Sequence, residues 1–276
     1  MLIDFHTHIF PEKIAERSVA ALIGGIRQQQ GENYQNPDGS PLCFRPATLE
    51  GLLNSMPAAG VDRSICLPIA TKPSQTQSIN RFAEEIRDAR ALSFGTLHPA
   101  DPEADAVLED LAARGFAGIK LHLQFQQYMI DSPEVIRILQ KAEQLGLLVV
   151  FHAGADIGLP PPVFAEPKNI RHVLDYVDGS NLIAAHLGGW EQWDAVEQYL
   201  VGTNICFDTA FIRQFISPEQ CLRIIRNHGA DKILFGSDSP WENPADTLEF
   251  VQSLGLTAEE YDKITYQNAL RLLKGA

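Results

Sequence analysis

Four histidines and one aspartate stand at the ends of hydrophobic runs, where side chains of distant segments can meet and do chemistry. His6 and His8 lie in Asp-Phe-His-Thr-His, close to the start of the chain. His152 ends a later run, His186 lies in Ala-His-Leu-Gly-Gly, and Asp238 lies in Gly-Ser-Asp-Ser-Pro. Imidazole nitrogens and carboxylate oxygens are ligands that suit zinc and its first-row neighbours. The residue types alone therefore indicate a metal enzyme.

The spacing of the first two histidines supports this interpretation. His6 and His8 are two residues apart on a predicted strand, so their side chains leave the same face and can meet on one ion. A lone histidine in a core usually finds a hydrogen-bond partner, but four histidines converging in a dry interior would leave several nitrogens unpaired. A metal ion removes that cost, and Asp238 adds an anionic oxygen ligand or a base.

The elements that must position these residues follow from the hydrophobic pattern. Short apolar runs alternate with amphipathic segments from one end of the chain to the other, with no break in composition that would mark a domain linker. The runs predict strands within 2–10, 63–70, 92–99, 116–123, 147–154, 182–189, 205–211 and 233–240. The segments between them predict helices within 47–60, 78–92, 102–115, 132–146, 168–179, 193–202, 217–229 and from 243 onward.

Eight nearly continuous apolar strands, each followed by a helix, favour a parallel sheet that is buried on both faces. We expect a single α/β domain over residues 1–276, closed into a (β/α)8 TIM barrel. An open doubly wound sheet usually carries a glycine-rich turn after its first strand, and here His6-Thr7-His8 stands in that place. Barrel enzymes keep their chemistry at the carboxyl ends of the strands, where all five residues lie.

The connection over residues 11–46 is far longer than the others. It contains a candidate helix near 12–26 and a polar stretch over 28–40. Connections of this length are often functional covers, and this one emerges on the catalytic face. We interpret it as a candidate lid.

Composition limits the partners. The formal charge of −13 and the lack of any Lys and Arg cluster argue against nucleic acid, whose binding depends on neutralised phosphates. No apolar run reaches membrane-spanning length. The four cysteines are far apart without a C-x-x-C pair, and the first eight residues are too polar for a secretion signal. We expect a cytoplasmic protein that acts on a small molecule.

Together these motifs resemble the amidohydrolase superfamily, specifically the amidohydrolase-related branch that includes aminocarboxymuconate-semialdehyde decarboxylase. The resemblance spans the whole chain. It implies that a divalent ion, commonly zinc, is held by four residues: His6, His8, His152 and Asp238. It also implies that His186 is an unliganded or second-metal histidine near the substrate, that Arg45 is a candidate clamp for a substrate carboxylate, and that a homodimer is a candidate assembly.

The fourth predicted strand leaves the number of ions open. Lys120 could be carboxylated and bridge two metals, as in other branches of the superfamily, and His122 lies two residues further on the same face. Gln124 stands near the position where other branches use a glutamate, and an amide is a poor metal ligand. One ion is the favoured expectation and two remain an alternative.

Three aromatic residues are secondary candidates for substrate binding. His98 ends the third predicted strand, while Trp190 and Trp241 follow the sixth and eighth. Aromatic walls suit a planar substrate, although packing or capping explains these residues as well.

The expected activity is hydrolysis of a small amide, ester or lactone by a metal-activated water, with Asp238 accepting its proton and His186 serving the leaving group. The alternative is metal-dependent, non-oxidative decarboxylation of an unsaturated or aromatic carboxylic acid, which the same residues can perform. A TatD-like or PHP-like phosphoesterase is disfavoured by the acidic charge and the missing fourth-strand glutamate. A catalytically inactive scaffold is disfavoured because all five residues are present.

Overall fold

The strands form where the hydrophobic runs predict them. The computed structural model describes residues 1–274. The third run yields two strands, separated by Phe94, and each of the others yields one. Within the described residues the strands are β1 (Ile3–Thr7), β2 (Arg63–Cys66), β3 (Ala91–Ser93), β4 (Gly95–Thr96), β5 (Gly118–Leu121), β6 (Leu148–Phe151), β7 (Leu182–Ala184), β8 (Cys206–Asp208) and β9 (Ile233–Leu234).

The helices occupy the amphipathic segments, and local signals set their ends. Ser217 caps α9 by accepting a hydrogen bond from the backbone N–H of Gln220, and Pro218 takes the first helical position. Thr48 caps α2 in the same way. The helices are α1 (Glu12–Gln30), α2 (Leu49–Ala59), α3 (Thr76–Glu85), α4 (Ala104–Ala113), α5 (Leu123–Gln126), α6 (Pro133–Gln144), α7 (Pro167–Val173), α8 (Trp193–Tyr199), α9 (Pro218–His228), α10 (Pro244–Ser253), α11 (Ala258–Asp262) and α12 (Asn268–Lys274).

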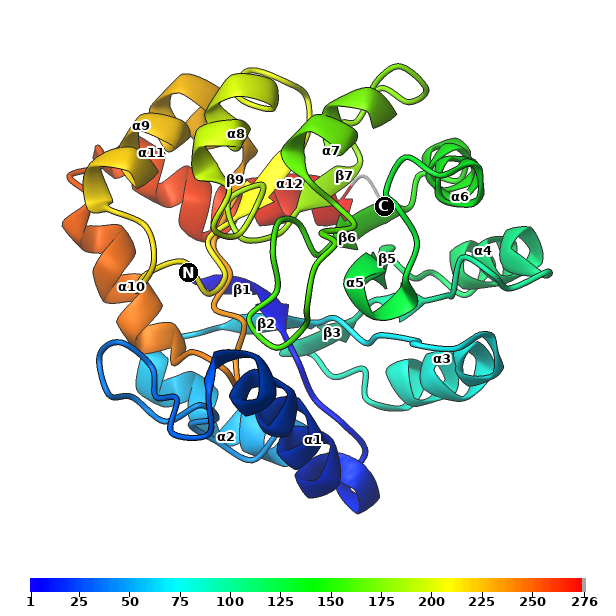
Figure 1. Cartoon of the computed structure of the whole chain (residues 1–276), viewed down its shortest axis with the longest axis horizontal. Coiled ribbons are helices and arrows are strands. Elements are labelled where there is room, and N and C mark those ends of the chain that lie inside the picture. Colours follow the sequence, from blue (N-terminus) through cyan, green and yellow to red (C-terminus); the bar gives the residue numbers. More distant parts are fainter. Residues whose placement is uncertain (275–276) are drawn as a thin grey trace.

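The strands are arranged in a ring that the helices surround (Figure 1). Neighbouring strands pair in parallel, in the orders β1-β2-β3 and β4-β5-β6-β7-β8-β9, and the chain joins the two sheets directly at Phe94. At the remaining seam, the backbone N–H of Phe5 donates to Phe235 O at 2.8 Å, and Thr7 forms a parallel bridge with Ser239. The expected (β/α)8 barrel is confirmed, with its seam between β1 and the end of β9.

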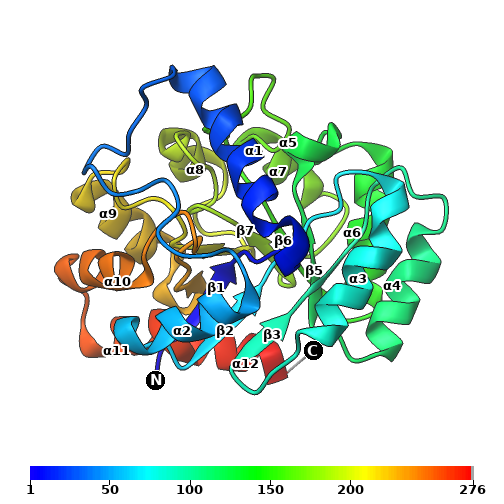
Figure 2. The ribbon, with the colours of Figure 1, turned by 90° about the horizontal axis from the view of Figure 1, so that it is seen from below.

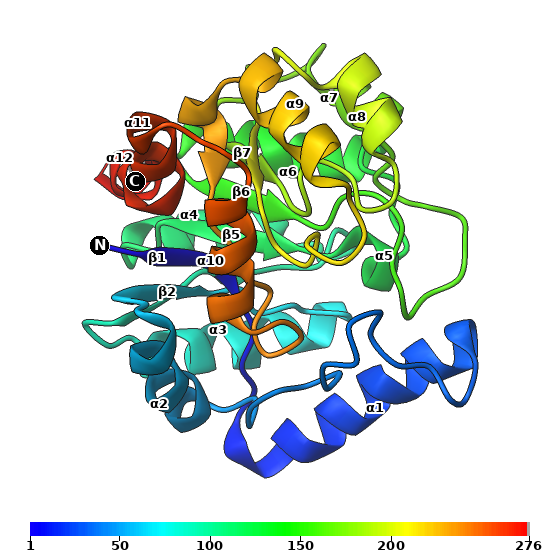
Figure 3. The ribbon, with the colours of Figure 1, turned by 90° about the vertical axis from the view of Figure 1, so that its left-hand side faces the viewer.

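Both faces of the strands are buried, as the continuous apolar runs predict. In β6, Val149 and Phe151 belong to the larger hydrophobic cluster, which includes side chains of the surrounding helices. Leu148 and Val150 belong to a smaller cluster, against which residues of α12 pack. Figure 3 shows α12 beside the N-terminus, at one end of the barrel. The opposite end is left for the loops that follow the strands.

The long connection over residues 11–46 is more ordered than a loop. Its first half is α1, which extends the helix expected near 12–26 to Gln30. Figures 2 and 3 show α1 outside the ring of strands, and the loop after β6 approaches its far end. There Gln30 Nε2 donates to Ile157 O at 3.1 Å. Among residues 1–274, no helix combines the length and the apolar character needed to cross a membrane.

Candidate metal centre

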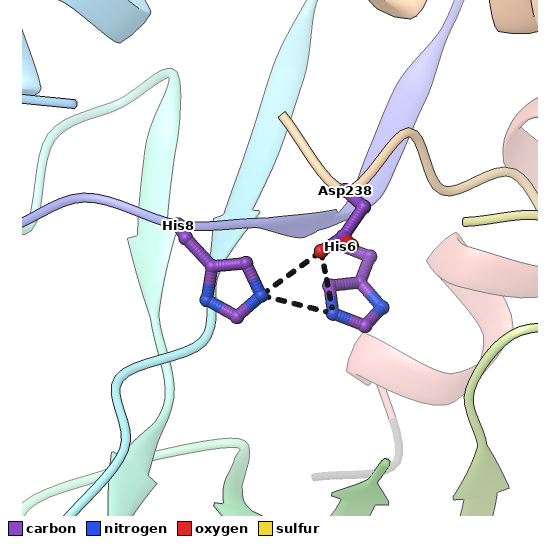
Figure 4. A group of neighbouring side chains, drawn as sticks. All are labelled: His6, His8 and Asp238. Atoms are coloured by element: carbon purple, nitrogen blue, oxygen red, sulfur yellow. Dashed lines mark hydrogen bonds and ion pairs between the residues drawn. The ribbon is translucent and has the colours of Figure 1, made fainter. Parts of the chain in front are cut away.

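Three of the predicted ligands converge at the seam of the barrel (Figure 4). His6 Nε2 lies 3.2 Å from His8 Nε2 and 3.3 Å from Asp238 Oδ1, and His8 Nε2 lies 3.0 Å from the same oxygen. In a tetrahedral site with bonds of about 2.0 Å, ligand atoms are about 3.3 Å apart. The three atoms are therefore spaced as ligands of one ion.

Hydrogen bonds fix which nitrogen of each ring faces the others. His6 Nδ1 lies 2.8 Å from Asp208 Oδ2, and His8 Nδ1 lies 3.0 Å from Leu67 O. Both partners can only accept, so each Nδ1 carries the proton, and the neutral ring presents a lone pair at Nε2. Metal-binding histidines are commonly oriented by such an outer acceptor.

The charges at this centre agree with a bound cation. Burial, with the nearby Lys120 ammonium, lowers the pKa of His6 well below its usual value, so the ring is neutral. Burial alone would raise the pKa of Asp238, but the neighbouring histidines His6, His8 and His186 hold it below its usual range. Two nitrogen lone pairs and a carboxylate oxygen thus face one another. This donor set fits a divalent ion, whose charge would offset their mutual repulsion.

A β-bulge in β1 helps to place these ligands. Asp4 pairs with Ser64, and Thr7 pairs with Cys66, so three steps along β1 match two steps along β2. One extra residue bends the strand and re-aims its side chains, a device that is common beside active sites. His8 lies just beyond the strand, so strict alternation along a regular strand does not describe how the two histidines meet.

Lys120 borders the same centre. Its side chain is buried, and its Nζ lies 3.3 Å from His6 Nε2. Burial lowers the pKa of Lys120 to about 8, so the free amine is accessible near neutral pH. The free amine is the form that carboxylation requires, and a carboxylated Lys120 stays a proposal.

His186 and His152 continue from the metal centre as a chain of rings. The His6 and His186 ring centres are 5.4 Å apart, and those of His186 and His152 are 4.7 Å apart. His186 Nε2 lies 3.0 Å from His152 Nδ1. The structure thus places His152 against His186, and the group formed by His6, His8 and Asp238 does not include it.

Two of these residues have strained backbones. His186 has a φ of 60° and Asp238 has a φ of 66°, both in the left-handed region that non-glycine residues rarely adopt. Such conformations cost free energy and cluster at functional sites. The loops after β7 and β9 therefore hold these two side chains in place at a cost in local stability.

Asp208 is a site residue that the sequence analysis missed. Besides holding His6, it accepts hydrogen bonds through Oδ1 from the backbone N–H groups of His186 at 2.9 Å and Ala210 at 3.1 Å. Its side chain is fully buried. It ends β8, within the predicted strand 205–211, so its position as an acid at a strand end was the signal that could have identified it.

The remaining candidates have defined partners. Arg45 is buried, and its guanidinium donates to Ser239 Oγ at 2.8 Å, Pro46 O at 2.8 Å and His8 O at 3.2 Å. These bonds hold the backbone around His8, so Arg45 supports the metal centre. Its contact with a substrate carboxylate stays a prediction. His98 Nδ1 accepts from the backbone N–H of Ala100 at 3.1 Å.

The two tryptophans lie in different surroundings. Trp190 is buried, and its indole N–H donates to Phe211 O at 3.1 Å. Its ring packs edge-on against Phe215, with ring centres 5.0 Å apart. Trp241 is half-buried against the larger hydrophobic cluster, three residues after Asp238. Trp190 therefore has a clear packing role, and Trp241 is the more accessible of the two.

Comparison with known proteins decides the family. The family model described as Amidohydrolase matches residues 3–275, nearly the whole chain. The chain belongs to the amidohydrolase family. The resemblance drawn from the strand-end residues is thereby confirmed, and membership of this family makes the protein an enzyme. No protein of curated function is similar enough to match this amidohydrolase.

Solved structures confirm the barrel fold of this amidohydrolase. An uncharacterised TIM-barrel protein from Bordetella bronchiseptica is 17% identical, with a TM-score of 0.72 over 99% of this chain and 98% of that chain. A 5-carboxyvanillate decarboxylase from Novosphingobium aromaticivorans, complexed with manganese and 4-hydroxy-3-methoxy-5-nitrobenzoic acid, is 15% identical, with a TM-score of 0.73 over 99% and 96%. A 2,6-dihydroxybenzoate decarboxylase from Rhizobium is 16% identical, with a TM-score of 0.66 over 99% and 98%.

Proposed function

We propose that this amidohydrolase catalyses the metal-dependent, non-oxidative decarboxylation of a small aromatic or unsaturated carboxylic acid. The observation that carries the proposal is the convergence of His6 Nε2, His8 Nε2 and Asp238 Oδ1 within 3.3 Å at the carboxyl ends of the strands. The choice of reaction is supported by the similar decarboxylases, which share the fold over almost their whole length. Decarboxylation, the alternative in the sequence analysis, thus has better support than hydrolysis.

His6, His8 and Asp238 would hold the ion, and His152 stays a proposed fourth ligand. When bound, the ion would supply a positive charge that orients a carboxylate or hydroxyl of the substrate and stabilises negative charge. Zinc was expected from the sequence, whereas the similar decarboxylase from Novosphingobium is complexed with manganese. A mixed nitrogen and oxygen ligand set accommodates either ion.

The chain's own residues must manage one proton. Decarboxylation breaks the carbon–carbon bond to the carboxylate and leaves its electron pair on the substrate carbon, which then takes a proton. We assign its delivery to His186, whose ring adjoins His6 and whose Nε2 can share a proton with His152 Nδ1 at 3.0 Å. Asp208 and the carbonyl of Ala210 hold His186 in place, because they bind its backbone N–H and its Nδ1.

Carbon dioxide release tests the reaction. Purified protein loaded with Mn²⁺ or Zn²⁺ would be assayed against hydroxylated benzoates, including 2,6-dihydroxybenzoate and 5-carboxyvanillate, and in parallel against aromatic esters and lactones. We expect carbon dioxide from at least one acid, lost in His8→Asn and retained in Asp131→Asn, a surface carboxylate that also contacts a histidine. Hydrolysis of an ester or lactone without any decarboxylation would return the assignment to the hydrolase.

The role of His186 has its own test. His186→Asn should lower turnover about a hundredfold or more, because proton transfer by a positioned group contributes roughly that much. Metal content, measured by mass spectrometry, should stay unchanged because His186 lies outside the group formed by His6, His8 and Asp238. Turnover close to that of the wild type would contradict its assignment as the proton donor.

A further inference from the structure

A buried histidine beside the metal centre has no part in the reaction as proposed so far. His122 directly follows β5, as His152 directly follows β6. These two strands are neighbours (Figure 1) and pair with Leu121 opposite Phe151, so the histidines stand at matching positions one residue further on. Their rings are stacked, with centres 4.3 Å apart and planes inclined by 15°. His122 therefore lies beside the row of rings that reaches the metal centre.

Two other side chains fix the ring of His122. The ring of Phe125 is 4.4 Å away, measured between ring centres. Asp156 Oδ2 lies 3.3 Å from His122 Nε2, while Asp156 Oδ1 accepts a hydrogen bond from the backbone N–H of Gly158 at 2.8 Å. The contact with Gly158 leaves Oδ2 directed toward the histidine.

Gln124 fastens the loop that carries Asp156. Its side-chain Nε2 donates to Pro160 O and to Pro162 O, both at 2.8 Å. Gln124 belongs to α5, which begins directly after His122. The amide that is a poor metal ligand thus has a structural role, because it joins α5 to the loop after β6 and keeps Asp156 against His122.

The contact with Asp156 decides where His122 carries its proton. A lone pair at His122 Nε2 would face a carboxylate oxygen, which can only accept, so the proton lies on Nε2. Burial favours the neutral ring, so Nδ1 carries a lone pair. This Nδ1 is buried and has no hydrogen-bond partner among residues 1–274. The ring therefore offers one unused acceptor.

The acceptor lies at a useful distance from the metal centre. Lys120, two residues earlier on β5, places its Nζ 3.3 Å from His6 Nε2. His122 still has an extended φ of −132°, so its side chain leaves β5 on the same side as that of Lys120. Two residues of a strand cover about 6.6 Å, which is the scale of one substituted aromatic ring. An acid held at the centre by its carboxylate would bring a ring substituent to His122.

We propose that His122 Nδ1 accepts a hydrogen bond from a hydroxyl group on the substrate ring and so selects hydroxylated aromatic acids, with Asp156 as the positioning residue. The inference rests on the proposed function, because it needs an aromatic acid bound at the metal centre. A buried acceptor left unpaired costs free energy, and a hydroxyl proton removes that cost. An ether oxygen has no proton to donate and leaves the cost in place. His152 stays free to serve as the fourth ligand of the centre.

Equilibrium binding of substrate analogues tests the inference without catalysis. Protein loaded with Mn²⁺ would be titrated calorimetrically with benzoate, the three monohydroxybenzoates and their methoxy counterparts. We expect one hydroxybenzoate to bind about five- to tenfold more tightly than benzoate, the usual net effect of one hydrogen bond. Its methoxy counterpart should show no such gain.

Replacing His122 should remove this preference and nothing else. His122→Phe keeps a ring against His152 but loses the acceptor, so the hydroxybenzoate should bind only as tightly as benzoate, whose own Kd should not change. In Asp156→Asn the proton is no longer fixed on Nε2, and the preference should fall as well. Asp131→Asn is the control, because it removes the carboxylate of an exposed pair with His172 and should keep the preference. A merely structural role of His122 would weaken all the acids alike.

Two outcomes would overturn the inference alone. One is a wild type that binds benzoate and every hydroxybenzoate equally; the other is a preference that survives in both His122→Phe and Asp156→Asn, which would place the hydroxyl elsewhere. If His122→Phe fails to fold, Asp156→Asn and the comparison of hydroxyl with methoxy compounds decide the question. Failure to bind any of these acids would contradict the proposed substrate class and the inference with it. A protein that shows the preference but releases no carbon dioxide would keep the inference and lose the proposed reaction.

Discussion

The outward-facing nitrogens of the site histidines are bound by oxygen acceptors, and these contacts decide what the rings can do. His6 Nδ1 uses Asp208, His8 Nδ1 uses Leu67 O, and His186 Nδ1 uses Ala210 O. Each acceptor fixes a tautomer and turns the other nitrogen inward. Asp208 matters most among them, because one carboxylate binds both His6 in β1 and His186 in the loop after β7.

Replacing Asp208 with asparagine should therefore weaken metal binding without removing a ligand. The amide N–H₂ would face His6 Nδ1 in place of an acceptor oxygen, so the proton of His6 would move to Nε2 and occupy the ligand position. We expect affinity for Zn²⁺ or Mn²⁺ to fall about 10- to 100-fold, the usual effect of losing an outer acceptor. Competition against a chromophoric chelator measures this affinity.

The surface variant Asp131→Asn is the matched control for that experiment. Asp131 also binds a histidine ring, His172 Nδ1 at 3.1 Å, but far less of this pair is buried. Its metal affinity should equal that of the wild type. An Asp208→Asn protein that binds metal as tightly as the wild type would show that the tautomer of His6 is fixed by something else.

At the scale of elements, the loops after the strands are held together by backbone contacts that only particular residues permit. The loop after β6 meets the loop after β7 in a parallel bridge between Gly154 and Trp190. Gly154 has a φ of 83°, and a Cβ at this position would overlap the backbone of Trp190. Glycine is therefore required here both for its conformation and for the close approach.

This requirement predicts a large difference between two glycine substitutions. Gly146→Ala should cost about 1–2 kcal/mol, because its φ of 69° is strained for alanine but a Cβ would meet open space. Gly154→Ala should cost about 3 kcal/mol or more, because the two loops must also separate. Denaturant unfolding of both variants measures the difference. Equal destabilisation would mean that the contact between Gly154 and Trp190 is not tight in solution.

The polar half of the long connection is fastened to the barrel by Arg213, which forms ion pairs with the exposed Asp38 and with the buried Glu242. Arg213, in the loop after β8, donates through Nη2 to Asp38 Oδ2 at 2.6 Å and through Nε to Glu242 Oε1 at 2.8 Å. Glu242 is buried, and its Oε2 has no hydrogen-bond partner among the described residues. Burial raises the pKa of Glu242 to about 7, although Arg213 opposes the shift.

Glu242 should therefore make stability depend on pH. Because its pKa is higher in the folded state than its usual 4.5, folding favours the protonated form. That stability is fully present below pH 4.5 and is lost as the pH rises through about 7. In Glu242→Gln this loss is absent, so the Tm of the variant relative to wild type should increase by a few degrees between pH 5 and pH 8. A Tm difference that is constant with pH would contradict the raised pKa.

At the scale of the whole molecule, the metal centre lies on the seam that closes the barrel. His6 and His8 belong to the first strand and its continuation, whereas Asp238 follows the last strand. Backbone bonds already cross this seam, including His8 N to Ser239 O at 2.6 Å and Asp238 N to His6 O at 2.9 Å. An ion held by these side chains would cross-link the two ends of the sheet.

Removing the ion should accordingly destabilise the whole fold. A ligand that binds only the native state adds about 2.7 kcal/mol when its free concentration is 100 times its Kd. We expect a chelator to lower the Tm of the metal-loaded protein, and added Mn²⁺ or Zn²⁺ to restore it. The His8→Asn and Asp238→Asn double variant should show little response to either treatment. A Tm that is indifferent to chelation in the wild type would argue against a resident ion at the seam.

The sequence by itself determined the strands, most of the helices and the five residues at strand ends. These features are local: alternating apolar runs, caps such as Ser217-Pro218 and glycines after helices act over a few residues. The barrel followed as well, because parallel buried strands separated by helices have few ways to pack. The sequence did not separate hydrolysis, its main expectation, from decarboxylation, because the same ligands serve both reactions.

Only the tertiary structure decided how those residues are grouped. The contact between His6 and Asp208 joins positions 202 residues apart, and no local pattern encodes it. The same holds for the bulge in β1 and for the separation of His152 from His6. Ring orientation, proton position and ligand spacing depend on distances of a few tenths of an ångström, which are set by packing across the barrel.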